Sequence, residues 1–201
     1  MMISCRSTRI VEEAKIKQPN ILLLLSDDQS FNTINALGNK EVSTPNMDRL
    51  VSEGTAFTHA HIMGGNTGAI CMPSRAMMMT GKNVQKFNNQ GALTSEDETM
   101  PQLLKEAGYA TFGTGKWHNN RDSYARSFTH GSNIFLGGMS NHLKVPLHDF
   151  DPSGEYLKRN RRFEDKFSSV LFREATVDFL QNYNGDKPFF AFVSFTSCLL
   201  Y

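Results

Sequence analysis

The sequence predicts an α/β fold in which helices flank a mainly parallel sheet. Two observations lead to this prediction. Short apolar runs typical of buried strands alternate along the chain with segments whose apolar residues recur at helical spacing. Gly, Pro and Thr residues stand between these segments, where helices are expected to begin and end. The chain contains no internal repeat, which favours one continuous domain.

The first expected strand is the apolar run 21–25, which Ser26, Asp27 and Asp28 end. Such a run is typical of a strand buried on both faces of a parallel sheet. The next elements are expected to be a helix from Pro45 closed by Gly54, a short strand at 55–58, and a helix at 74–80 closed by Gly81, in which Met77, Met78 and Met79 fill the core.

The second half of the chain continues the alternation. A helix is expected to open at Thr99, Met100 and Pro101, to turn Leu103, Leu104 and Ala107 inward, and to stop at Gly108. A strand at 109–114 then runs into residues 115–118. Residues 119–165 are rich in Gly, Asn, Pro and charge and are expected to be long irregular excursions. The last elements are an amphipathic helix at 170–183 and an apolar strand at 188–195.

The composition is that of an ordinary globular protein. Of 201 residues, 39% are hydrophobic and 20% are charged, and the net charge is +1. This balance gives no indication of a nucleic-acid partner or of an anionic membrane. No apolar run approaches the length of a membrane span. Residues 1–18 lack the apolar core of a secretory signal and are expected to be a disordered tail before a domain at 19–201.

Polar residues follow two of the predicted strands. Asp27 and Asp28 come directly after the first, and Lys116 and His118 come after the strand at 109–114. Ligands of open α/β sheets bind outside the carboxyl ends of the strands. The two groups are therefore expected at one edge of the sheet, where they indicate a site.

The most specific segment is residues 71–81, which read Cys-Met-Pro-Ser-Arg-Ala-Met-Met-Met-Thr-Gly. It resembles the C-x-P-S-R-x-x-x-x-T-G motif of the sulfatase family at every fixed position. The flanking segments stand in the family's order as well: the strand that ends in Asp27 and Asp28, the run 44–50, and the run 115–118. The resemblance covers about 19–195 and implies an alkaline-phosphatase-like fold that cleaves sulfate esters of small molecules or glycans.

The resemblance implies that a formylglycine-generating enzyme oxidises Cys71 to formylglycine. A thiolate that attacked a sulfate ester would form an adduct with no easy exit. In the hydrated aldehyde, one hydroxyl attacks sulfur and the other then loses its proton and expels sulfate, so one hard step becomes two easier ones. A helix that began near Ser74 would turn free N–H groups toward Cys71, which suits an anion. The alternative is a structural cysteine before a helix.

Asp27 and Asp28 are the predicted metal ligands, together with residue 71. Carboxylate oxygens suit a hard dication, and the resemblance favours calcium, with magnesium as an alternative. Such an ion would hold the sulfate oxygens and offset the charge that grows in the transition state. The alternative is a solvated pair of aspartates that caps a helix.

The other predicted site residues are basic. The resemblance gives Arg75 contact with the formylglycine and support of the metal site, with a surface ion pair as the alternative. Lys116 would contact a sulfate oxygen, and His118 would help to move the nucleophile's proton, although a single histidine is more often structural. Within the irregular region, His148 is a candidate substrate contact, with a solvated loop as the alternative.

The sequence departs from the family after the last strand. Residues 196–201 read Thr-Ser-Cys-Leu-Leu-Tyr where the family has Thr-x-Pro-His-Asp-Pro. The family's second pair of metal ligands and second sulfate-binding lysine have no counterpart. We therefore expect an incomplete chain with weak calcium binding and little turnover. The competing hypotheses are a phosphonate or phosphodiester hydrolase of the same superfamily and a non-catalytic, truncated homologue with an exposed sheet edge after Phe195.

Overall fold

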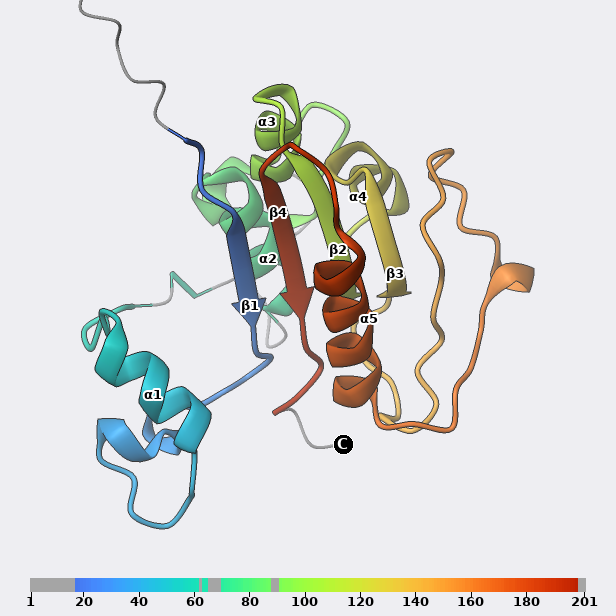
Figure 1. Ribbon diagram of the computed structural model, residues 1–201. Helices are drawn as coiled ribbons and strands as arrows, with labels where there is room; N and C mark the ends of the chain where they lie inside the picture. Colours follow the sequence, from blue (N-terminus) through green and yellow to red (C-terminus); the bar gives the residue numbers. More distant parts are fainter. Residues whose placement is uncertain (1–16, 62, 65–69, 88–90, 199–201) are drawn as a thin grey trace, which may run out of the picture.

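The computed structural model describes residues 17–61, 63–64, 70–87 and 91–198 (Figure 1). Within this part, four parallel strands form one sheet in the order β1-β4-β2-β3. The strands are β1 (Ile21–Leu25), β2 (Ala110–Lys116), β3 (His130–Phe135) and β4 (Phe189–Ser194). The predicted α/β class with a parallel sheet is therefore confirmed. Residues 1–16 of the expected tail lie outside the described part.

Helices cover both faces of the sheet (Figure 1). One face packs against α5 (Ser168–Asn182), and the other packs against α2 (Cys71–Thr80), α3 (Met100–Glu106) and α4 (Arg121–Ser127). Helix α1 (Pro45–Glu53) lies beyond the end of β1. Short 3-10 turns complete the chain: η1 (Phe31–Thr33), η2 (Asn35–Leu37), η3 (Val84–Lys86) and η5 (Lys158–Asn160). No helix among the described residues is long and apolar enough to cross a membrane.

The alternation of β4 divides the core into two sides. Phe190 and Phe192 point into the cluster on the α2 side, which also contains Trp117. Ala191 points the opposite way, into the cluster beneath α5. Successive strand side chains point to opposite faces, so a strand that is apolar at every position can be buried on both. This is the environment of β4 in the middle of the sheet.

Two predicted helices differ from expectation in detail. Helix α2 begins at Cys71 and not near Ser74, because the Ser74 amide already donates to the Ile70 carbonyl at 2.9 Å. In α3 the inward positions are Pro101 and Leu104, three residues apart. Leu103 is 50% exposed, and Ala107 is exposed, so the inward placement of these two residues was wrong.

The expectation of irregular chain at 119–165 was also wrong, since this region contains α4 and β3. The buried residues of α4 are Ser123, Tyr124 and Ser127, so two of three positions on its inner face carry no apolar signal. Strand β3 contains glycine, serine and asparagine before its apolar end. The short strand expected at 55–58 is absent, and these residues are irregular.

Strand β1 was expected to be buried on both faces, and this is wrong. Leu22 is 46% exposed and Leu24 is 50% exposed. Both lie on the α5 side of the sheet, but β1 is an edge strand and α5 packs over its inner neighbours, β4 and β2. The expectation of an exposed sheet edge at the strand that ends near Phe195 is also wrong. This strand, β4, pairs with β1 on one side and with β2 on the other.

Replacing Leu22 and Leu24 together with Thr is expected to reduce binding of the dye ANS and self-association. Because both side chains are about half in water already, the expected loss in free energy of unfolding is below about 1 kcal/mol. The matched control is Leu23→Thr, since Leu23 packs against the buried core. That change is expected to cost about 2 kcal/mol or more. Equal losses in urea unfolding would show that the outer face of β1 is covered.

Candidate functional site

The end of β1 places two carboxylates at the carboxyl edge of the sheet. The pairing of β1 with the β4 strand continues past both elements, with the Asp27 amide donating to Ser197 and the Cys198 amide donating to Asp27, each at 2.7 Å. Asp28 then takes a left-handed backbone conformation with φ of 51°. One ligand atom each from Asp27, Asp28 and Cys71 lies within 4.8 Å of the other two. The structure thus brings the three predicted metal ligands together.

Helix α2 brings residue 71 and Arg75 to the same place. Residues four apart lie on one helix face, so both side chains point toward the end of β1. The helix stops at Gly81, whose left-handed φ of 67° lets its amide donate to the Met77 carbonyl at 2.8 Å. The closing Thr80-Gly81 of the motif therefore has a structural role. It ends the helix that carries the nucleophile candidate.

Asp27 is the centre of a buried ion-pair network. Its Oδ1 accepts from Arg75 at 3.0 Å, and its Oδ2 accepts from Lys116 Nζ at 2.6 Å. The side chains of Lys116 and Arg75 are only 0% and 3% exposed. Arg75 also donates to the Lys116 carbonyl at 2.9 Å and to the Ser194 hydroxyl. Burial lowers the pKa of Arg75, and the negative charge of Asp27 opposes that shift.

Two cations around one carboxylate leave this network with a net positive charge, which Asp28 beside it reduces. A site with a net positive charge suits an anionic ligand. The negative charge of that ligand would also balance a cation bound by the two aspartates. The network joins β1, α2 and β2. A residue from each of three distant segments is therefore held in position before any ligand enters.

His118 follows β2 and has an unusual backbone conformation, with φ of 49°. Burial and, to a smaller extent, the positive charges of Lys116 and Arg75 together lower its pKa to about 4, against the opposing charge of Asp27. The imidazole is therefore neutral at neutral pH. Its Nδ1 is buried and has no hydrogen-bond partner in the described part of the chain. A neutral ring with a free nitrogen is able to accept a proton.

Asn119 also lies at the site, although no motif in the sequence predicts a role for it. Its side-chain NH₂ group donates to the Met72 carbonyl at 3.4 Å, and its Oδ1 accepts from the Leu93 amide at 2.9 Å. It thereby ties the segment after β2 to the first turn of α2. Its position directly after His118 was the only signal that could have pointed to it.

His148 does not join this cluster. It pairs with Ile134 in an isolated bridge beside β3 and is 2% exposed, with its ring edge-to-face against Tyr156 at 5.6 Å. It makes no hydrogen bond or ion pair with the described residues of the cluster. Its predicted role in substrate binding stays a prediction.

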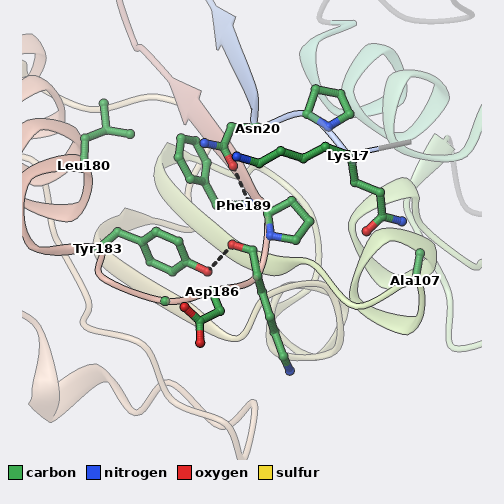
Figure 2. Close-up of a pocket in the computed structure, with 12 residues that line it drawn as sticks. Lys17, Asn20, Ala107, Leu180, Tyr183, Asp186 and Phe189 are labelled. Carbon is green, nitrogen blue, oxygen red and sulfur yellow. Dashed lines mark hydrogen bonds between the residues drawn. The ribbon is translucent and has the colours of Figure 1, made fainter. Parts of the chain in front are cut away.

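A large cavity lies at the opposite end of the strands (Figure 2). Its volume is about 1250 Å³, and it is formed around Asn20 before β1 and Phe189 at the start of β4. The hydrogen bonds drawn there join side chains to the backbone. Tyr183 donates to the Lys187 carbonyl at 2.8 Å, and Asn20 accepts from the Phe189 amide at 3.0 Å. None of the predicted site residues lines this cavity, so it is not the candidate site.

The donor set at the end of β1 fits a hard dication. Two of the three grouped ligands are carboxylates, and Asp28 is exposed, with an open approach. The thiol of Cys71 is a poor calcium ligand, so residue 71 would fit a hard dication only if it carried an oxygen in place of sulfur. Both oxygens of Asp27 already accept from a cation, Arg75 or Lys116. A metal ion would therefore have to bind the lone pairs of Asp27 that these two cations leave unused.

The chain matches known proteins over most of its length. A family model described as Sulfatase matches residues 19–198. The N-acetylglucosamine-6-O-sulfatase of Bacteroides thetaiotaomicron is 29% identical over 190 residues, which cover 93% of this chain and 32% of that protein. The N-acetylgalactosamine-6-sulfatase of Homo sapiens is 26% identical over 203 residues, which cover 87% of this chain and 38% of that protein.

The fold of the chain is also similar to that of a solved structure. The structure of BT4656 in complex with its substrate, D-glucosamine-2-N,6-O-disulfate, superposes with a TM-score of 0.75 at 26% identity. The match covers 91% of this chain and 35% of that one. The predicted alkaline-phosphatase-like fold is thereby confirmed. The chain spans about a third of the length of the proteins it matches.

Proposed function

The chain belongs to the sulfatase family, and on that premise we propose that it supplies the nucleophile side of a sulfuric ester hydrolase site acting on sulfated glycans. The observation that carries the proposal is the convergence of Asp27, Asp28 and Cys71, with Arg75 and Lys116 bonded to Asp27. The matched proteins named above act on sulfated amino sugars by their names or bound substrate, which favours a glycan over another sulfate ester.

Residue 71 is the proposed nucleophile after oxidation. As hydrated formylglycine it would supply the hydroxyl that attacks sulfur, a role for which a thiolate is unsuited. In the first turn of α2, Pro73 has no N–H and the Ser74 amide donates to Ile70. This leaves the amides of residue 71 and Met72 as the N–H groups without a partner in the helix, and these favour an anionic substrate group there.

Asp27 and Asp28 are the proposed metal ligands, with residue 71. Calcium held there would bind sulfate oxygens and offset negative charge in the transition state. Calcium takes six to eight oxygen ligands in proteins, about twice what these three residues offer. The remaining donors have to come from outside this group of residues.

The basic residues have different proposed tasks. Arg75 uses its donors on Asp27, Ser194 and the Lys116 carbonyl, so it positions the carboxylate and the end of β2. Lys116 gives one N–H to Asp27 and has two more for a sulfate oxygen. His118, neutral because its pKa is lowered to about 4, would accept the proton of the attacking hydroxyl.

The mass of the peptide that contains residue 71 tests this proposal. In a host with a formylglycine-generating system, we expect an aldehyde in place of the thiol at residue 71. Cys198 is an internal control, since it is exposed, lies outside the motif and should stay an alkylatable thiol in the same sample. An unmodified residue 71, in a host that modifies a known sulfatase in parallel, would refute the proposed nucleophile.

A further inference from the structure

A second pocket lies beside the candidate site. Its volume is about 550 Å³, within the range of small-molecule sites. It is formed by the start of α4, the segment after β3, and the loop near η5. Its charged lining residues are Arg121, Asp122 and Arg161. We call it the Arg121–Arg161 pocket.

The pocket shares a wall with the candidate site. Asn119 lines it and also donates to the carbonyl of Met72, the residue after the proposed nucleophile. On another side it is lined by Gly137. The next residue, Gly138, packs so closely on His118 that a Cβ at that position would lie 2.3 Å from the ring. A ligand that reaches residue 71 past His118 and Asn119 therefore extends toward this pocket.

The two arginines of the pocket have no carboxylate partner within the described part of the chain. Arg121 donates to the Glu155 carbonyl at 3.0 Å, which fixes its guanidinium and leaves other donors unused. The exposed side chain of Arg161 makes no hydrogen bond or ion pair there. The carboxylate that lines the pocket, Asp122, is already bonded to Arg126 at 2.8 Å. The pocket thus holds two uncompensated positive charges.

The positive field extends to neighbouring residues. Burial lowers the pKa of His148, and the charges of Arg161 and Arg121 lower it further. The negative charges of Asp149 and Asp151, close in sequence to His148, oppose this shift and do not overcome it. At His148 the two arginines thus act in the same direction as burial and against the two carboxylates.

We propose that the Arg121–Arg161 pocket binds a second anionic group of the substrate, a sulfate or a carboxylate on the sugar that carries the ester to be cleaved. This inference rests on the proposed function for its reaction, and on the pocket alone for its binding. Guanidinium groups bind both anions with paired hydrogen bonds, so the geometry favours this class over a neutral hydroxyl. The substrate class is then a glycan with at least two negative charges.

Binding to the whole chain tests the proposal without turnover. The probes are D-glucosamine-2-N,6-O-disulfate, glucosamine 6-O-sulfate, and a disaccharide of uronic acid and glucosamine 6-O-sulfate. NMR titration follows the amides of Gly137 and Gly154, which line the pocket. We expect the disulfate or the uronate to bind about tenfold more tightly than the monosulfate. The probe with the larger gain identifies the anion.

The variant Arg161→Gln removes an exposed side chain that makes no hydrogen bond or ion pair with the described residues, so it is not expected to affect folding. With Arg121→Gln added, the preference is expected to disappear while the monosulfate affinity changes less than about twofold. Arg173→Gln on α5, with a 65% exposed side chain, is the matched control and should keep the preference. A preference that survives in the double variant, or no preference in the original chain, would overturn the proposal. An unmodified residue 71 would refute the reaction and leave this binding result standing.

Discussion

Replacing Asp27 with Asn is expected to lower the free energy of unfolding by about 3–5 kcal/mol. The change removes the negative charge between Lys116 and Arg75, whose side chains are 0% and 3% exposed. Two buried cations would then lack a counter-charge, and their desolvation would no longer be offset. Urea unfolding followed by circular dichroism measures the loss. Asp27→Asn should also abolish the calcium binding that we propose for the candidate site.

Asp122→Asn is the matched control for this change. Asp122 also pairs with an arginine, Arg126 at 2.8 Å, but its side chain is 63% exposed. A solvent-exposed pair of this kind contributes about 0.5 kcal/mol or less. The double variant Asp27→Asn with Lys116→Met should recover part of the loss, because one unpaired cation is gone. If Asp27→Asn costs no more than Asp122→Asn, the buried network is not what holds β1, α2 and β2 together.

The site was more predictable from the sequence than much of the fold around it. Asp27, Asp28 and His118 follow strands and Lys116 ends one, and parallel strands present their carboxyl ends at one edge. Local patterns were therefore enough to place them together. The motif added Cys71 and Arg75, whose spacing by four residues puts them on one face of α2. That these residues act in catalysis is a prediction, whereas their proximity is a property of the structure.

The wrong predictions of burial in α4 and in β1 have a common physical cause. The inner face of α4 contains Ser123 and Ser127, whose hydroxyls find buried partners, so burial there needs no apolar residue. Strand β1 shows the reverse case, since Leu22 and Leu24 are apolar and exposed. Hydrophobic pattern predicts burial only where a neighbouring element covers the residue. Which strand lies at an edge is decided by pairing between distant segments.

The arginines of the second pocket were not predicted either. Arg121 and Arg161 are 40 positions apart in a region that looked irregular. Their proximity depends on α4 and on the Asp151–Tyr156 turn, in which Asp151 accepts from Ser153 at 2.9 Å and from Tyr156 at 3.3 Å. Sequence patterns over windows of ten to twenty residues contain no information about which residues 40 positions apart lie close together in the fold.

Gly115→Ala is expected to have the second large effect, because this glycine sets how closely β2 approaches β4. Its φ is +85°, and a Cβ there would lie 1.9 Å from the backbone oxygen of Ser194. The strands would have to separate next to Lys116 and Ser194, both of which contact Arg75. We expect a loss of about 3 kcal/mol or more in the free energy of unfolding, from backbone strain and from the clash together.

Gly108→Ala separates these two contributions. Gly108 has a similar φ of +94°, but a Cβ there would meet nothing within 4 Å. Its replacement should therefore cost only the conformational strain, about 1 kcal/mol. The difference between the two variants in urea unfolding gives the cost of pushing β2 away from β4. If the variants lose equal stability, the close approach at Gly115 can relax, and the position of Lys116 relative to Asp27 does not depend on a glycine at this site.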